Sequence, residues 1–330
     1  MKFLRRIATL LVILVAVAAG LVYFLSTPDV PDSVLMAKYG QPPSRFLALP
    51  GGTRAHYRDY MADSASTADA TPTLVLLHGS NASLHTWEPW VRQFSSSMRV
   101  ITVDLPGHGL TGATVEADYS PEGMVAFVDS FTRTLGLAQF VLGGNSMGGH
   151  IAWRYTLAHP ERVSKLVLVD PGGITMPGMD TPQPMAFRLA RSPFAAPLLR
   201  RVTPRSLFAK TIKQAFYDKS LVTEQMIDRY WELNRRPGTR EATFARFKLP
   251  RFDPANMPRL HEIAVPTLVL WGREDVLLPV AYAEYFRQTI PHVQVIIYDR
   301  CGHLPMEEVP ARSAEDVRRF VEGDKRPTLK

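Results

Sequence analysis

The sequence predicts an α/β fold, in which helices cover both faces of a mostly parallel β-sheet. Two observations lead to this expectation. Short apolar runs rich in valine, isoleucine and leucine recur along the chain, and amphipathic stretches of helical length separate most of them. Parallel strands are buried on both faces and joined by helices, which produces this alternation. The hydrophobic share of 46% supplies enough apolar surface for a full core.

The expected elements follow in chain order. Residues 46–49 and 53–60 flank "PGG" and form a hairpin. Helices are expected at 86–94, at 120–137 with Ser120 as the N-cap, and from Met147 onward. The parallel strands are expected within 73–79, 99–109, 139–144, 165–171, 266–272 and 293–299. The carboxyl ends of such strands lie at one edge of the sheet, where the reactive groups of this fold class gather.

The N-terminal segment differs from the rest of the chain. Lys2, Arg5 and Arg6 precede an uncharged apolar run from Ile7 to Leu25, which holds 19 residues. At a helical rise of about 1.5 Å per residue, this run matches the hydrocarbon core of a bilayer. The cations before it predict that the N-terminus stays inside and that the body is exported, to the periplasmic or extracellular face. We expect an uncleaved transmembrane anchor at 1–26, with a cleaved signal peptide and a secreted protein as the alternative.

A serine stands at the most distinctive turn of the sequence. The stretch "FVLGGNSMGGHIAWRY" (140–155) begins as a strand and continues as a helix, with Ser146 between the two. A sharp turn of this kind requires neighbours without side chains, which Gly144 and Gly148 provide. The turn lifts the serine hydroxyl out of the sheet, beside the first N–H groups of the helix. We interpret Ser146 as a nucleophile that attacks a carbonyl carbon.

A serine nucleophile requires a base and an acid that orients the base. His303 follows the last expected strand, which suits the base in the chain order serine, acid, histidine. Asp275 follows the preceding strand and is the expected acid. Asp170, one strand earlier, is the second candidate, whereas we expect the neighbouring Glu274 to be solvated.

Two backbone N–H groups are expected to hold the oxyanion that forms during the attack. One belongs to Met147, the residue directly after the nucleophile. The other belongs to Ser80, in the loop "HGSNASLHTW" (78–87) that follows the first parallel strand. His78 opens this loop, so we assign it to the oxyanion loop and not to the catalytic base.

With these motifs in place, the sequence resembles the α/β-hydrolase superfamily over residues 44–322. The resemblance rests on "LLHGS", "DLPGHG", "GNSMGG", "WGREDVLLP" and "CGHLPMEEVP", in that order. It implies an α/β-hydrolase sheet, a triad of Ser146, Asp275 and His303, and a helical cap over the active site. "GNSMGG" and "LVLVDPGG" are similar to hydrolases that cleave carbon–carbon bonds in ring-fission products, and to a group of bacterial lipases and esterases.

The expected domain division has an anchor at 1–26, a linker at 27–43, a hydrolase core at 44–173 and 256–330, and a helical cap inserted at 174–255. The cap carries 15 lysine and arginine residues against seven acidic ones, while the whole chain has a net charge of +7. A solvated basic helix surface explains this excess. The alternative is that the basic cap binds the surface of an anionic membrane. No nucleic-acid-binding motif accompanies the charge, so nucleic acid is not an expected partner.

The sequence-based expectation is a membrane-anchored serine hydrolase, a carboxylesterase or lipase acting on apolar or lipid-like esters. Two alternatives stay open: hydrolysis of a carbon–carbon bond in vinylogous diketone acids, and a non-catalytic binding module of the same fold. We expect no metal, no organic cofactor and no obligate protein partner. The single cysteine, Cys301, excludes an intramolecular disulfide and a zinc site built from cysteines. The expected partners are an ester substrate and the membrane, through residues 7–25 and the basic cap.

Overall fold

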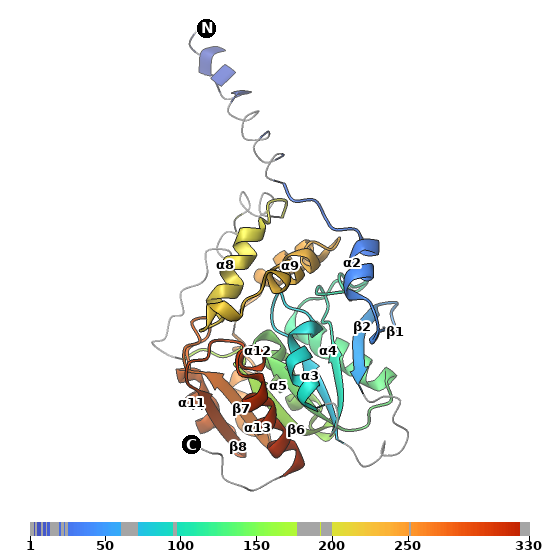
Figure 1. Ribbon diagram of the computed structural model, residues 1–330, viewed down its shortest axis with the longest axis vertical. Helices are drawn as coiled ribbons and strands as arrows, with labels where there is room; N and C mark the ends of the chain where they lie inside the picture. The colour runs from blue at the N-terminus through green and yellow to red at the C-terminus, as the bar shows by residue number, and fades with distance from the viewer. Residues whose placement is uncertain are drawn as a thin grey trace.

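An eight-stranded sheet forms the centre of the computed structural model (Figure 1). The structure describes residues 26–60, 72–94, 98–176, 192, 200–250 and 252–323, together with isolated positions before Ser26. The strands follow the order β1-β2-β4-β3-β5-β6-β7-β8 across the sheet. Their bounds are β1 (Ser44–Ala48), β2 (Arg54–Tyr60), β3 (Thr73–Leu77), β4 (Arg99–Val103), β5 (Phe140–Asn145), β6 (Val163–Val169), β7 (Thr267–Gly272) and β8 (Val293–Tyr298).

The predicted mostly parallel sheet is confirmed. From β4 through β3 and β5 to β8, every neighbouring pair of strands is parallel. The early hairpin of β1 and β2 adds an antiparallel edge beside β4. The parallel strands lie in the interior because helical crossovers cover both of their faces.

Successive side chains of each central strand point to opposite faces of the sheet and belong to two different apolar clusters. Val75 and Leu77 of β3 point into one cluster, while Leu74 and Leu76 point into the other. This alternation follows from the two-residue period of a strand. The helices of the first face are α4 (Pro121–Thr134), α5 (Met147–Ala158) and α11 (Ala281–Thr289), and those of the second face are α3 (Glu88–Phe94), α12 (Pro305–Glu308) and α13 (Pro310–Glu322).

The segment after β6 leaves the sheet and forms further helices above it in Figure 1. They are α8 (Arg205–Ala215), α9 (Glu224–Leu233) and α10 (Thr239–Phe247). The sequence predicts helices at 206–218 and 223–238, which correspond to α8 and α9. It predicts none at α10, because Gly238 is expected to end the second of them. Gly238 has a φ of 81° and stands directly before α10, so this left-handed turn starts a new helix. The helix expected near 184–202 lies mostly outside the described residues.

Part of the predicted extended linker is helical in the structure. Residues 32–39 form α2 (Asp32–Tyr39), which follows Pro31. Leu35 and Tyr39 are buried and share an apolar cluster with Leu233 of α9. Burial of this face against α9 accounts for the helix, because the isolated segment is too short to be helical alone.

Ion pairs also join the linker (27–43) to the cap segment (174–255). Arg236 pairs with Asp32 at 2.9 Å, and Arg240 pairs with Asp29. Part of the positive charge that the sequence assigns to the cap surface is therefore neutralised within the molecule.

The predicted transmembrane anchor at 7–25 lies mostly outside the described residues. Among the residues that the structure describes, no helix is long and apolar enough to cross a bilayer. The anchor and the exported location stay predictions from the sequence.

Candidate active site

Ser146 lies at the turn between β5 and α5, on a backbone that its neighbours hold in place. Its φ of 54° and ψ of −114° are a conformation that residues other than glycine rarely adopt. The Ser146 N–H donates to the carbonyl oxygen of Val169 at 3.0 Å, and the Gly172 N–H donates to the Ser146 carbonyl oxygen at 2.9 Å. The hydroxyl therefore stands at the carboxyl edge of the sheet on a strained but fixed turn.

The two glycines beside the serine are required by space. A Cβ atom on Gly144 would lie 2.3 Å from the carbonyl oxygen of Gly148. A Cβ atom on Gly148 would lie 2.2 Å from the carbonyl oxygen of Leu77 in β3. Any side chain at either position would push α5 away from the sheet and displace the hydroxyl.

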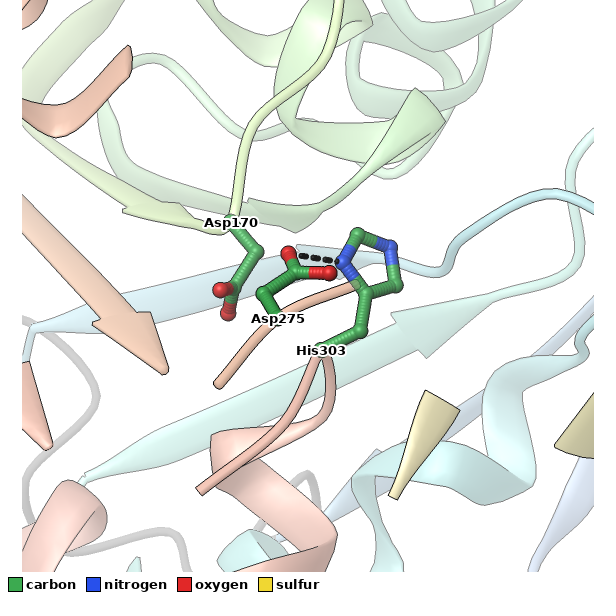
Figure 2. A group of neighbouring side chains, drawn as sticks. All are labelled: Asp170, Asp275 and His303. Atoms are coloured by element: carbon green, nitrogen blue, oxygen red, sulfur yellow. Dashed lines mark hydrogen bonds and ion pairs between the residues drawn. The ribbon is translucent and has the colours of Figure 1, made fainter. Parts of the chain in front are cut away.

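His303 and Asp275 are in direct contact (Figure 2). The distance from Nδ1 of His303 to Oδ2 of Asp275 is 2.6 Å, and both side chains are buried. The N–H groups of Leu277 and Leu278 donate to Oδ1 of the same carboxylate at 2.7 Å and 3.0 Å. Because the carboxylate accepts, the proton of the imidazole lies on Nδ1 and the lone pair lies on Nε2. His303 is therefore in the tautomer that a base opposite a serine requires.

Asn145 ties the serine turn to the histidine loop, a contact that the sequence does not reveal. Its buried Nδ2 donates to the carbonyl oxygen of Val169 at 3.1 Å and to that of His303 at 3.2 Å. The hydrogen bonds of the described residues do not include one from the Ser146 hydroxyl to the imidazole. In proteins without substrate such bonds are often long, and they tighten when the substrate binds.

The expected oxyanion donors lie beside the serine. A Cβ atom on Gly79 would lie 3.4 Å from the Cβ of Ser146, so the loop with Ser80 passes directly next to the hydroxyl. Met147 is the first residue of α5, at the positive end of the helix dipole. In the described part of the chain, the N–H groups of Ser80 and Met147 donate to no other backbone group. Two open donors beside one hydroxyl form the arrangement that stabilises an oxyanion.

Asp170 lies behind Asp275 and does not replace it. Its side chain is fully buried at the end of β6, and its Oδ1 accepts the N–H of Gly272 at 3.0 Å. Its Oδ2 is buried, and no group of the described residues donates to it. Burial raises the pKa of Asp170 well above its ordinary value, and the negative charge of Asp275 adds to this shift.

Asp170, Asp275 and His303 present ligand atoms within 4.8 Å of one another, which is close enough to hold a metal ion. The chemistry of the group does not favour one. Nδ1 of His303 already donates a proton to Asp275, so a metal at this nitrogen would have to displace that proton.

The cap segment reaches the oxyanion loop through two side chains that sequence reasoning did not single out. Asn234 donates from Nδ2 to the carbonyl oxygen of Asn81 at 2.8 Å. Arg246 of α10 donates from Nη2 to Oγ of Ser80 and Oδ1 of Asn81, at 3.1 Å each. In the sequence, Arg246 is one of 15 basic residues of the cap, and nothing in the pattern separates it from the surface arginines.

The other buried histidines are engaged in hydrogen bonds away from the serine. His78 bonds the carbonyl oxygen of Gly79 through Nδ1 at 2.7 Å and accepts the N–H of Leu105 at Nε2 at 3.0 Å. His56 bonds Asp104 at 2.6 Å. With both nitrogens of His78 occupied, it supports the oxyanion loop, in agreement with its place in the sequence.

Because of His108, the folded protein should lose stability as the pH falls. It donates from Nδ1 to the carbonyl oxygen of Pro106 at 2.9 Å, and its buried Nε2 has no partner among the described residues. Burial lowers the pKa of His108 well below the ordinary value. The unfolded chain therefore binds a proton that the folded chain does not. Between about pH 7.5 and 5.5, this residue alone should remove about 1.4 kcal/mol from the unfolding free energy. His108→Asn keeps a donor for the carbonyl oxygen of Pro106. Over the same pH range, its unfolding free energy should fall by about 1.4 kcal/mol less than that of the wild type, as measured by urea unfolding.

The matched control is His292→Asn, because His292 is exposed. It should leave the pH dependence of unfolding as in the wild type. Equal pH dependence of the wild type and His108→Asn would contradict the assignment of His108 as a neutral residue.

The comparisons with known proteins agree with this geometry. A family model for the alpha/beta hydrolase fold matches residues 72–310. The chain belongs to this family. This α/β hydrolase is 32% identical over 264 residues to a 2-hydroxy-6-oxononadienedioate/2-hydroxy-6-oxononatrienedioate hydrolase of Paraburkholderia phymatum, across 77% of this chain and 87% of the relative. It is 30% identical over 277 residues to a 2-hydroxymuconate semialdehyde hydrolase of Pseudomonas putida, across 81% of this chain and 92% of the relative.

A solved structure is similar over nearly the whole chain. It is the crystal structure of a membrane phospholipase A, described as a bacterial virulence factor, with a TM-score of 0.72 and 27% sequence identity. The match covers 97% of this α/β hydrolase and 98% of the other chain.

The curated relatives contradict the expectation of ester hydrolysis. They are hydrolases of 2-hydroxy-6-oxo dienoic acids and of a related semialdehyde. Such molecules contain no ester bond, so their hydrolysis breaks a carbon–carbon bond. The sequence motifs left this possibility open as an alternative, but we preferred the ester because of the apolar N-terminal run and the loop "HGSNAS". Hydrolysis of an ester and of a carbon–carbon bond both need an oxyanion hole, so the sequence of this loop does not identify the bond that is cleaved.

Proposed function

We propose that this α/β hydrolase cleaves a carbon–carbon bond in vinylogous diketone acids of the 2-hydroxy-6-oxo dienoate class. The curated relatives support the proposal through the substrates in their names. Within this chain, the observation that carries it is Arg246, a cation beside the candidate oxyanion loop that pairs with no acidic side chain of the described residues.

Arg246 lacks the compensation that a shielded charge normally has. Among the described residues, its Nη2 donates to the neutral side chains of Ser80 and Asn81, and its Nη1 is shielded from solvent without a hydrogen-bond partner. The guanidinium lies over the Phe247 ring, 5.6 Å from its centroid, which adds no negative charge. Burial lowers the pKa of this guanidinium to about 10. A buried cation is costly unless an anion completes its hydrogen bonds. A substrate carboxylate would supply that anion, because a guanidinium binds carboxylates in a matched planar geometry.

The reaction needs a nucleophile, a base and an electron sink. We assign Ser146 as the nucleophile and His303 as the base that accepts its proton, while Asp275 orients the imidazole. The Ser146 oxygen bonds to the ketone carbon, and the N–H groups of Ser80 and Met147 hold the resulting oxyanion.

When the oxyanion collapses, the carbon–carbon bond beside the ketone breaks. This requires the diketo tautomer of the substrate, in which the proton of the C2 hydroxyl has already moved to C5. The electron pair of the broken C5–C6 bond then passes through the C3–C4 double bond to the C2 carbonyl oxygen, which takes up a proton. The acyl group stays on Ser146 until water attacks it, with His303 again taking the proton. The products are a carboxylic acid and a shorter 2-hydroxy dienoate, and no redox cofactor enters the balance.

The test is a comparison of three substrate types with the purified full-length chain. They are a 2-hydroxy-6-oxo dienoate, a p-nitrophenyl ester and phosphatidylcholine vesicles. Loss of the dienoate absorbance, with kcat/KM above that for the other two substrates, is the expected result. Faster hydrolysis of the phospholipid or the ester, or no dienoate turnover by folded protein, would overturn the proposal.

Arg246→Gln should weaken binding of the acid substrate. Hydrogen bonds to a charged group contribute about 1.5–3 kcal/mol, so KM for the dienoate should rise about 10- to 100-fold. Glutamine keeps a donor for Ser80 and Asn81, so kcat should change less than KM. Steady-state kinetics on the dienoate measures both quantities.

Two comparisons separate recognition from support of the loop. The neutral carboxamide analogue of the substrate should be turned over equally by the wild type and Arg246→Gln. Arg205→Gln is the matched arginine control, because Arg205 pairs with Glu224 and Asp228 on the surface of the cap segment. An equal loss on the acid and the amide would mean that Arg246 only holds the loop.

A further inference from the structure

We propose that Asp170 is a neutral carboxylic acid that donates its proton to Asp275 and thereby sets how strongly the Asp275–His303 pair holds a proton. It acts through Asp275 and is a positioning residue. The proposal rests on the proposed roles of Asp275 and His303.

Three buried groups from three different segments meet at this point (Figure 2). Asp170 follows β6, Asp275 follows β7, and His303 follows β8. Atoms of all three lie within 4.8 Å of one another, and the exposed fractions of the three residues are 0%, 7% and 5%. Burial, the negative charge of Asp275 and a hydrogen bond between the two side chains raise the pKa of Asp170, so this carboxyl group favours its protonated form.

The hydrogen bonds decide which carboxyl group is the anion. Asp275 faces three donors, namely the N–H groups of Leu277 and Leu278 and the Nδ1–H of His303. In the part of the chain that the structure describes, Asp170 faces one donor, the N–H of Gly272, and its Oδ2 faces none. Hydrogen bonds to the charged form favour ionisation. Asp275 is therefore the carboxylate, and Asp170 carries the proton on the oxygen that has no donor of its own.

The surrounding groups strengthen this division. The charged and titratable groups around the pair are Glu308 of α12, Glu274, Cys301 and His303. Glu308 opposes a second negative charge on Asp170. Burial raises the pKa of the Cys301 thiol, so Cys301 adds no charge at neutral pH.

A proton shared with Asp275 weakens that carboxylate as an acceptor. Asp275 then attracts the imidazolium form of His303 less strongly than an unassisted carboxylate would. Removal of the Asp170 donor should therefore strengthen the attraction of Asp275 for the imidazolium form. A residue that only fills space behind Asp275 would not have this effect.

Two measurements that do not depend on enzyme turnover test the proposal. The first is the infrared difference between the wild type and Asp170→Asn at neutral pH. The carbonyl band of a protonated carboxylic acid should be present in the wild type and lost in the variant. The second is the pH midpoint of the His303 imidazole, followed by nuclear magnetic resonance in protein with labelled histidine and assigned with His303→Gln. Failure of the proposed reaction would leave both readouts usable.

Two variants set the expected result. Asp170→Asn can accept from Gly272 and donate to Asp275, so the His303 midpoint should stay at the wild-type value. Asp170→Leu removes the donor, and the midpoint should rise by about one pH unit. If Asp170→Leu does not fold, as judged by circular dichroism, the infrared band and Asp170→Asn still decide the question.

Three results would overturn the proposal. Absence of the protonated-acid band means that Asp170 is ionised. A fall of the His303 midpoint in Asp170→Asn means the same, because the variant would then remove a negative charge. An unchanged midpoint in folded Asp170→Leu means that Asp170 does not act on the imidazole.

Discussion

Replacing Ser146 by alanine should lower kcat on a 2-hydroxy-6-oxo dienoate by about 10⁴-fold or more, while KM changes little. The variant removes the atom that attacks the ketone, and no other hydroxyl in this turn stands between the candidate oxyanion donors and His303. The backbone hydrogen bonds of residue 146 to Val169 and Gly172 do not use the side chain, so the turn should persist. Single-turnover kinetics and the melting temperature measure the two effects separately.

Ser164→Ala is the matched serine control. Ser164 lies near the start of β6, whereas the candidate site gathers at the opposite, carboxyl end of the strands. This variant should keep the wild-type rate. Substantial turnover by folded Ser146→Ala would contradict the assignment of the nucleophile and favour a mechanism in which water attacks the ketone directly.

The features that sequence reasoning could predict are those set by local sterics and chain order. The turn around Ser146 needs glycine at 144 and 148 because the backbone of β3 and α5 leaves no space there. The alternation of buried runs and helices similarly requires a parallel sheet. Once these are in place, strands β7 and β8 deliver Asp275 and His303 to the same edge, and the structure shows the two in contact.

The features that sequence reasoning missed depend on contacts between distant segments. Asn145 holds the His303 loop across 158 positions of sequence, and Arg246 contacts Ser80 across 166. No local pattern marks such partners, because periodicity describes how one element meets the core and not which element lies opposite. Asp170 was a candidate by its place after a strand, but only the hydrogen-bond geometry shows that it stands behind Asp275.

The same limit explains the helix within the linker. Prolines at 28, 31, 42 and 43 predict an extended chain, and the stretch from Asp32 to Tyr39 has no strong helical signal of its own. Packing of Leu35 against α9 decides its conformation. The preferred reaction failed for a related reason, since the bond that is cleaved depends on the substrate and the triad alone is common to many hydrolases.

Asp275→Asn should lower kcat by about 10³- to 10⁴-fold. Three N–H groups donate to the Asp275 carboxylate, in addition to the proposed proton of Asp170: the N–H groups of Leu277 and Leu278 on Oδ1, and Nδ1–H of His303 on Oδ2. An asparagine must turn its NH₂ group toward one side. Facing the two backbone donors costs more, so the NH₂ group should face the imidazole. His303 would then accept at Nδ1 and carry its proton on Nε2, where it cannot take the proton of Ser146.

Asp170→Asn provides the matched contrast, because it makes the same chemical change one strand away. Its amide oxygen can accept the Gly272 N–H, and its NH₂ group can donate to Asp275, so kcat should stay within about threefold of the wild type. Glu274→Gln, next to Asp275 in the sequence, should also be mild, since Glu274 accepts the N–H of Cys301 and the amide oxygen can do the same. A larger loss for Asp170→Asn than for Asp275→Asn would reverse the assignment: the acid that serves His303 would then lie at the end of β6, and the contact at 2.6 Å between Asp275 and His303 would have no catalytic role.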